Sequence, residues 1–244
     1  MTVKEFSDEF DTRLNSYAQQ QEFGEGASKL NITLDEYEKS LFLTKAQKEY
    51  VIAYYTGKNT FGYSFEEKEY VREALDALVD TYTTNSPVSA DSKHLSDGKH
   101  TFTFYAIPDD LLWILYEQAT FTNDTGCVCA NGKVAEVIPT THDELHRRLR
   151  NPFRGTLKTR VLRLNSTDNQ VELISDYPIG SYTLRYVKEP QPIILVALTD
   201  DLSIDGETSA MTCALPEVTH TEILDRAVAL AVQSKMLGAS KSNG

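Results

Sequence analysis

The amino-acid sequence predicts an α+β protein. N-terminal helices and a returning C-terminal helix are expected to form a helical bundle, with an antiparallel β region between them. Hydrophobic residues recur at three- and four-residue steps near both ends of the chain, as in amphipathic helices. In the middle they alternate with polar residues or flank turn sequences, as in antiparallel strands. We therefore expect a helical bundle of residues 1–82 and 219–238, a linker at 83–98 and an antiparallel β domain at 99–215.

The first helix is predicted from one apolar stripe. Its members are Val3, Phe6, Phe10, Leu14 and Tyr17. Residues 15–31 are polar and contain glycine, so we expect a loop there. Thr33 is followed closely by Asp35 and Glu36. This predicts the first turn of a helix, because the helix dipole favours acidic residues there.

Two further helix starts are predicted from capping-box patterns. Thr44–Gln47 has the spacing of one such box and predicts a second helix that ends at Gly57. Ser64–Glu67 has the spacing of another, and the helix behind it has an apolar face that continues to Tyr82. A third box, Thr219–Glu222, predicts the start of the last helix, which we expect to end near Gly238.

The central region contains several predicted strands. The alternating or apolar stretches that predict them are His100–Tyr105, Val161–Leu164, Val171–Ile174, Ser181–Val187 and Ile193–Leu198. Val161–Leu164 and Val171–Ile174 flank polar residues and are expected to form a hairpin. Leu111–Phe121 is compatible with a strand or a helix. Val128–Ala130 and Val134–Ile138 flank Asn131-Gly132, which is a strong signal for a two-residue hairpin turn.

Composition excludes several protein classes. The chain has 244 residues and a net charge of −12, and no apolar run approaches the roughly 20 residues that cross a bilayer. Three cysteines cannot form a disulfide framework, and their odd number favours a reducing compartment. The first residues have no apolar signal region. We expect a globular protein that is made in a cytoplasm and does not contact a membrane.

One motif points to metal chemistry. His142 and His146 are four residues apart, as in helical zinc sites, but Asp143 stands where a metalloprotease has its general-base glutamate. Cys127 and Cys129 could form a zinc site together with His142 and His146, although structural zinc sites space their thiols more widely. We favour a solvated helix start with no metal or catalytic role. A zinc-dependent hydrolase that uses His142 and His146 is the alternative function.

Residues 142–163 reverse the sign of an otherwise acidic chain, with seven cations against two acids. The cations are Arg147, Arg148, Arg150, Arg154, Lys158, Arg160 and Arg163. Three interpretations compete: pairing with the chain's own acids, with the acidic surface of a neighbouring copy, or with phosphates. These seven residues are therefore the candidates for a subunit interface or a DNA channel.

Several longer stretches resemble the ring proteins of the head-to-tail connector in crAss-like bacteriophages, which form the adaptor tier beneath the portal. The stretches are Asn151–Gly155, Arg160–Leu164, Glu172–Ile179, Ser181–Tyr186, Asp35–Leu41, Cys213–Glu217 and His220–Leu224. The resemblance covers most of residues 33–235, whereas residues 1–30 and the stretch around 83–99 resemble nothing that we can identify.

The resemblance implies a structural virion protein at the head–tail junction, without enzymatic activity or cofactor. It implies a ring of about twelve copies, as is usual for phage connectors. Its partners would be the portal protein, neighbouring ring and tail proteins, and packaged DNA that passes through the lumen without sequence recognition. A sheet-based module that binds a carbohydrate or a receptor is a weaker alternative, for which the 13 tyrosines are the only support.

Overall fold

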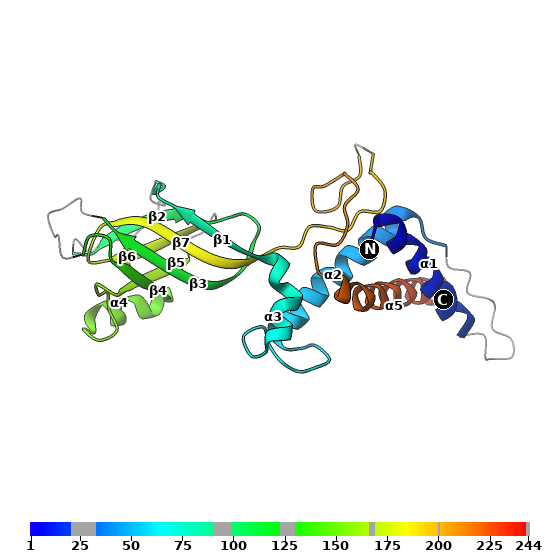
Figure 1. Cartoon of the computed structure of the whole chain (residues 1–244), viewed down its shortest axis with the longest axis horizontal. Coiled ribbons are helices and arrows are strands. Elements are labelled where there is room, and N and C mark those ends of the chain that lie inside the picture. Colours follow the sequence, from blue (N-terminus) through cyan, green and yellow to red (C-terminus); the bar gives the residue numbers. More distant parts are fainter. Residues whose placement is uncertain (21–32, 90–98, 123–129, 166–168, 200, 243–244) are drawn as a thin grey trace. The chain divides into compact units, whose positions relative to one another are not determined.

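The computed structural model of the chain describes residues 1–20, 33–89, 99–122, 130–165, 169–199 and 201–242 (Figure 1). In these residues it has the mixed α+β composition that the sequence predicts. The helices are α1 (Val3–Gln20), α2 (Glu36–Thr56), α3 (Glu69–Leu75), the 3-10 helix η1 (Asp76–Leu78), α4 (His142–Arg150) and α5 (Glu217–Ser242). The strands are β1 (Val79–Thr84), β2 (Thr101–Ala106), β3 (Leu111–Phe121), β4 (Val134–Pro139), β5 (Arg160–Asn165), β6 (Gln170–Ser175) and β7 (Ile179–Lys188).

The chain divides into two compact units. Met1–Leu78 and Glu189–Gly244 form the helical unit, and Val79–Lys188 forms the sheet unit. The expected domain boundaries at 82, 99, 215 and 219 remain a prediction. None of the helices within the described ranges is long and apolar enough to cross a membrane.

In the helical unit α5 packs against α1 and α2. The predicted stripe of α1 is confirmed at Phe6, Phe10 and Leu14, which are buried, whereas Tyr17 is exposed. The predicted start of α5 at a capping box is wrong. The helix begins at Glu217, and the Thr219 hydroxyl donates to the Pro216 carbonyl at 2.8 Å.

Helix α2 is one element, not two, so the predicted helix start at Thr44 is wrong. The capping box is formed by Asp35 and Glu38: the Glu38 N–H donates to Asp35 Oδ1 at 2.7 Å, and the Glu38 side chain accepts from the Asp35 N–H. The predicted end is confirmed, since Gly57 adopts a left-handed conformation with φ 77°. A Cβ at Gly57 would also lie 3.1 Å from the Ser64 nitrogen.

Thr44 has a different role, which it shares with Ser40 and Gln47. These three buried side chains lie on one stripe of α2 and bind the backbone of the segment that follows the sheet unit. Thr44 Oγ1 donates to the Ile193 carbonyl at 3.3 Å and accepts from the Ile193 N–H at 3.1 Å. The segment therefore satisfies the buried backbone groups of Ile193 and the N–H of Leu195 on a helix, while Ile194 pairs with the backbone of Met211. Ile193–Leu198 is accordingly not the expected strand, and Ile194 makes only an isolated bridge to Met211 among the described residues.

The helix predicted to run from Ser64 to Tyr82 is shorter at both ends. It begins at Glu69, and after η1 the chain continues as β1, which pairs with β7 from Val79↔Val187 to Thr84↔Tyr182. The sequence of β1, Val-Asp-Thr-Tyr-Thr-Thr, is rich in residues that favour strands. Tertiary pairing therefore overrides the helical spacing of Val79 and Tyr82.

The sheet has the strand order β1-β7-β3-β4-β5-β6-β2. The β5–β6 hairpin and the β7 strand are confirmed, and Leu111–Phe121 is a strand. The expectation of a purely antiparallel region is wrong in one place, because β4 and β5 are parallel. A parallel pair needs a crossover connection, and α4 provides it. Of the predicted Asn131-Gly132 hairpin, β4 is present and Gly132 has φ 70°, while residues 128–129 lie outside the described ranges.

The sheet curls, so that its two edge strands are linked. Val88, four residues beyond β1, donates its N–H to the Phe104 carbonyl of β2 at 2.8 Å. One face carries the larger core, which includes Tyr105, Phe121, Leu173, Tyr182 and Leu184. The opposite face of β5 and β6 packs against α4 through a second cluster, formed by Leu145, Leu162, Leu164 and Ile174. Successive residues of a strand therefore serve different cores.

We predict that Thr44→Val destabilises the protein by about 1–3 kcal/mol, because it leaves the buried N–H and C=O of Ile193 without partners at nearly unchanged volume. Thr44→Ser keeps the hydroxyl and is the matched control. Urea unfolding followed by circular dichroism measures the difference. Equal midpoints for the two variants would contradict the role given to the hydroxyl.

Candidate interaction surface

The basic stretch begins on the crossover between two parallel strands. β4 ends at Pro139, α4 follows, and residues 151–159 lead into β5. Leu145 and Leu149 attach α4 to the sheet, which leaves the opposite face of the helix exposed. Asp143 and Glu144 lie in the first turn and three arginines in the last, an arrangement that the helix dipole favours. Hydrogen bonds from the Thr141 side chain and from backbone N–H groups lower the pKa of Asp143.

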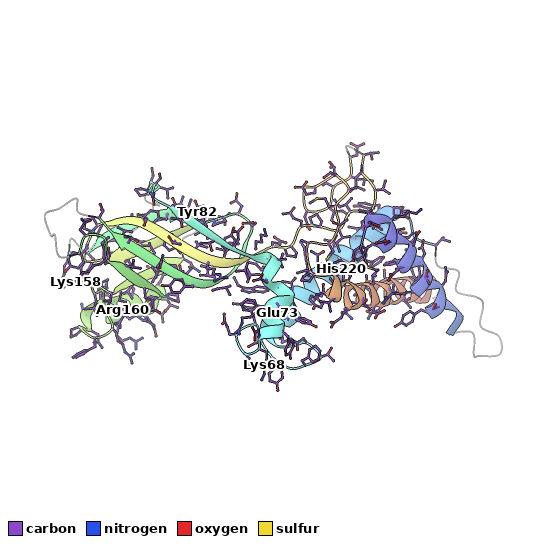
Figure 2. The ribbon with its side chains drawn as sticks, in the orientation of Figure 1. Lys68, Glu73, Tyr82, Lys158, Arg160 and His220 are labelled. Carbon is purple, nitrogen blue, oxygen red and sulfur yellow. The ribbon has the colours of Figure 1, made fainter. Side chains whose placement is uncertain are left out.

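Four of the seven candidate cations have partners in their own unit. Arg148 forms an ion pair with Glu144 at 2.9 Å, and Arg160 donates to the Phe153 carbonyl at 2.6 Å. Lys158 lies 6.0 Å from the centre of the Tyr177 ring. Arg163 is buried. Figure 2 shows Lys158 and Arg160 on the part of the sheet unit that carries α4.

Arg163 belongs to a buried network and not to a surface. Its Nε lies 3.3 Å from Glu117 Oε2, and the Tyr182 hydroxyl donates to the other oxygen of Glu117. Glu117 is only 5% exposed and Arg163 8%. Burial raises the pKa of Glu117, against the opposing effects of Arg163 and of the Tyr182 hydrogen bond. Three strands, β3, β5 and β7, each contribute one of these side chains.

Arg147, Arg150 and Arg154 are exposed, and none of them forms an ion pair or hydrogen bond through its side chain with the described residues. Together with Lys158 they make a positively charged surface around residues 147–158. The structure thus separates the seven candidates into two groups. Four are exposed, including Lys158, and the other three, Arg148, Arg160 and Arg163, have a hydrogen bond or an ion pair within the sheet unit.

Phe153, which no sequence pattern marked as a candidate, lies between the exposed arginines. Its side chain is 84% exposed, although the surrounding loop is well ordered by hydrogen bonds. The Phe153 N–H donates to Asn151 Oδ1 at 2.9 Å, and the Gly155 N–H donates to the Asn151 carbonyl at 2.8 Å. A Cβ at Gly155 would lie 3.1 Å from that carbonyl oxygen, so the turn needs glycine. The sequence Asn-Pro-Phe-Arg-Gly could have predicted a turn with an exposed aromatic side chain, because Asn, Pro and Gly favour turns.

The alternative metal site receives no further support. His142 and His146 are both exposed on α4, and no group of three or more metal-ligating side chains occurs among the described residues. Cys127 and Cys129 lie outside the described ranges. Cys213 is a free and buried cysteine, and burial raises its pKa to about 11, which keeps it a thiol at neutral pH.

Comparison with known proteins gives consistent matches over nearly the whole chain. The family described as phage tail ring protein 3/4 matches residues 1–243, including the N-terminal 30 residues. Ring protein 3 of Bacteroides phage crAss001 is 46% identical over 236 residues, which is 96% of each chain. Ring protein 4/5 of the same phage is 29% identical over 244 residues, covering 95% of this chain and 92% of that protein.

We predict that Arg163→Met destabilises the protein by about 3–5 kcal/mol at neutral pH, because it leaves the Glu117 carboxylate buried without a cation. The pKa of Glu117 is already above its ordinary value of 4.5 and would rise further. Because the pKa of Glu117 is higher in the folded than in the unfolded chain, the free energy of unfolding falls as pH rises from the unfolded pKa to the folded pKa. The stability that Arg163→Met loses relative to the wild type therefore becomes smaller as pH decreases.

Glu117→Gln combined with Arg163→Met is the control, because it removes both charges. Urea unfolding at neutral and acidic pH should show that the double variant loses less stability than Arg163→Met alone. Additive losses that do not depend on pH would contradict a coupled buried pair.

Proposed function

Because the chain belongs to the phage tail ring protein 3/4 family, we propose that it is a structural subunit of an oligomeric ring in the virion of a crAss-like phage. The proposed role is mechanical and not enzymatic. The relatives bear the names Ring protein 3 and Ring protein 4/5, and these names motivate the proposal of self-association.

In this proposal the ring belongs to the head-to-tail connector, where it joins the portal to tail components and surrounds the channel through which DNA leaves. The copy number would be about twelve, the usual value for phage connectors. The portal protein, neighbouring ring and tail proteins and packaged DNA are the proposed partners. The acidic net charge of −12 favours weak, non-specific contact with passing DNA, limited to the few exposed cations.

The observation that carries the proposal is the separation of charge between the two units. The helical unit contains 12 basic and 23 acidic residues, a net charge of −11, while the sheet unit has a net charge of −1. Four of the exposed cations of the sheet unit, Arg147, Arg150, Arg154 and Lys158, lie within residues 147–158. Subunits of a closed ring contact each other head to tail through two different surfaces, and surfaces of opposite charge meet this requirement.

The mass of the purified chain tests the proposal directly. Native mass spectrometry or light scattering should show a closed oligomer of about twelve copies, the number proposed above. If the chain alone is monomeric, the same measurement after mixing with the portal protein should show the assembled ring. A chain that stays monomeric with and without portal would contradict the proposal.

We predict that Arg147→Glu with Arg150→Glu weakens assembly by at least about tenfold while leaving the fold unchanged, because both side chains are exposed and neither forms a salt bridge within 4 Å of an acid among the described residues. Arg147→Lys with Arg150→Lys preserves the charge and is the control. Sedimentation velocity over a concentration series measures assembly, and thermal unfolding checks the fold. Assembly of the Glu variant at wild-type concentrations would exclude these two arginines from the interface.

A further inference from the structure

The loop that follows α4 has the properties of a preformed protein-binding anchor. We define the basic loop as Arg150, Phe153, Arg154 and Lys158. Exposed aromatic and arginine side chains are the residues that dominate binding energy at protein interfaces. The Asn151 hydrogen bonds fix the backbone on both sides of Phe153. Because the loop is already ordered, little conformational entropy is lost when it binds.

The helical unit contains an exposed surface of complementary character. We define the acidic aromatic surface as Phe61, Tyr63, Tyr70, Glu66, Glu69 and Glu73. Its three aromatic side chains are all exposed, and the Phe61 and Tyr70 rings contact edge to face at a centroid distance of 5.2 Å. Glu73 follows Tyr70 by three residues on α3, so the two share a face of the helix. Figure 2 shows Glu73 on α3 and Lys68 on the preceding loop.

The acids of this surface are available for a partner. Glu66, Glu69 and Glu73 are exposed, and none forms an ion pair with a described residue. The nearby cations have other contacts: Arg72 donates to the Glu66 carbonyl at 3.1 Å, and Lys68 lies over the Tyr63 ring at 4.9 Å.

The loop that carries Phe61 is also held by an asparagine. The Asn59 side chain accepts from the Phe61 and Gly62 N–H groups at 3.0 and 2.9 Å and donates to the Tyr63 carbonyl at 2.8 Å. Gly62 adopts a φ of 72°, which favours glycine. Both surfaces therefore present exposed aromatic side chains on ordered loops, and they differ in the sign of their charge.

We propose that the basic loop of one copy docks on the acidic aromatic surface of the next copy, with Phe153 as the central anchor. In this contact Arg150 and Arg154 pair with acids of α3 and stack on the aromatic rings of the acidic aromatic surface, which favour guanidinium groups. The proposal rests on the ring function proposed above and names the two surfaces that meet. Each copy contributes one of each, so the contact propagates in one direction and gives a ring when the rotation between successive copies closes.

A second copy fits the basic loop better than DNA does. Phosphate binding requires cations only and leaves the exposure of Phe153 unexplained. The three cations of the basic loop, on a chain of net charge −12, also give weak attraction to a polyanion. The acidic aromatic surface offers acidic side chains to the cations of the basic loop and aromatic side chains to Phe153.

Two truncation variants test the pairing. The loop variant is Arg150→Ala, Phe153→Ala and Arg154→Ala, and the surface variant is Phe61→Ala, Glu69→Ala and Glu73→Ala. All six side chains are exposed, so thermal unfolding should be unchanged within error. Each variant alone should assemble about thirtyfold more weakly than the wild type, since anchor residues dominate such interfaces. An equimolar mixture should form 1:1 dimers and no ring, because it contains one intact loop and one intact surface per pair.

The matched charge exchange is the second arm. Arg150→Glu with Arg154→Glu should abolish ring formation, and adding Glu69→Arg with Glu73→Arg to the same chain should restore it. Native mass spectrometry, with portal present if the wild type requires it, reads all samples. Ring formation by either truncation variant at wild-type concentrations, or a failure of the exchange to restore assembly, would overturn the docking proposal while the wild-type ring preserves the proposed function. Intact rings with reduced retention on a DNA column would instead assign the basic loop to DNA. A wild-type chain that never assembles overturns both.

Discussion

The helical unit depends on a line of polar side chains on α2. Ser40, Thr44 and Gln47 bind backbone groups of Gln191, Ile193 and Leu195, and without them the buried N–H groups of Ile193 and Leu195 would lose these partners. Residues 191–195 closely follow β7, so the same hydrogen bonds fix the place at which the chain returns to the helical unit. α2 therefore buries hydroxyl and amide groups on a face where most helices bury only aliphatic side chains.

In the sheet unit, strand pairing provides the partners for the buried backbone groups. The antiparallel register of β1 with β7 puts Val79 opposite Val187, so the first and last residues of the unit are neighbours. An insertion with adjacent ends constrains its host little, which is why such insertions are tolerated in compact proteins. The bridge from Val88 to Phe104 then links the two sheet edges, and a linked edge offers fewer unpaired backbone groups to other chains.

Sequence patterns predicted the elements that are determined locally. The stripe of α1, the end of α2 at Gly57, the β5–β6 hairpin and β7 are confirmed, and the family match confirms the resemblance to crAss-like phage ring proteins. Thr44 was misjudged because a hydroxyl that binds a distant segment has the same local spacing as a helix cap. The pairing of Arg163 with Glu117 was equally invisible, since only the β3–β7–β5 arrangement brings these residues together.

The uneven charge also limits which contacts between copies are favourable. Two helical units, each with a net charge of −11, repel one another at separations within the Debye length of about 8–10 Å. Two sheet units are nearly neutral and gain little from electrostatic attraction. In the proposed ring, a contact between a helical unit and the cations at residues 147–158 would combine attraction with a surface that each copy presents once. Repulsion disfavours symmetric pairing of two helical units, so repulsion as well as attraction would select the proposed head-to-tail contact.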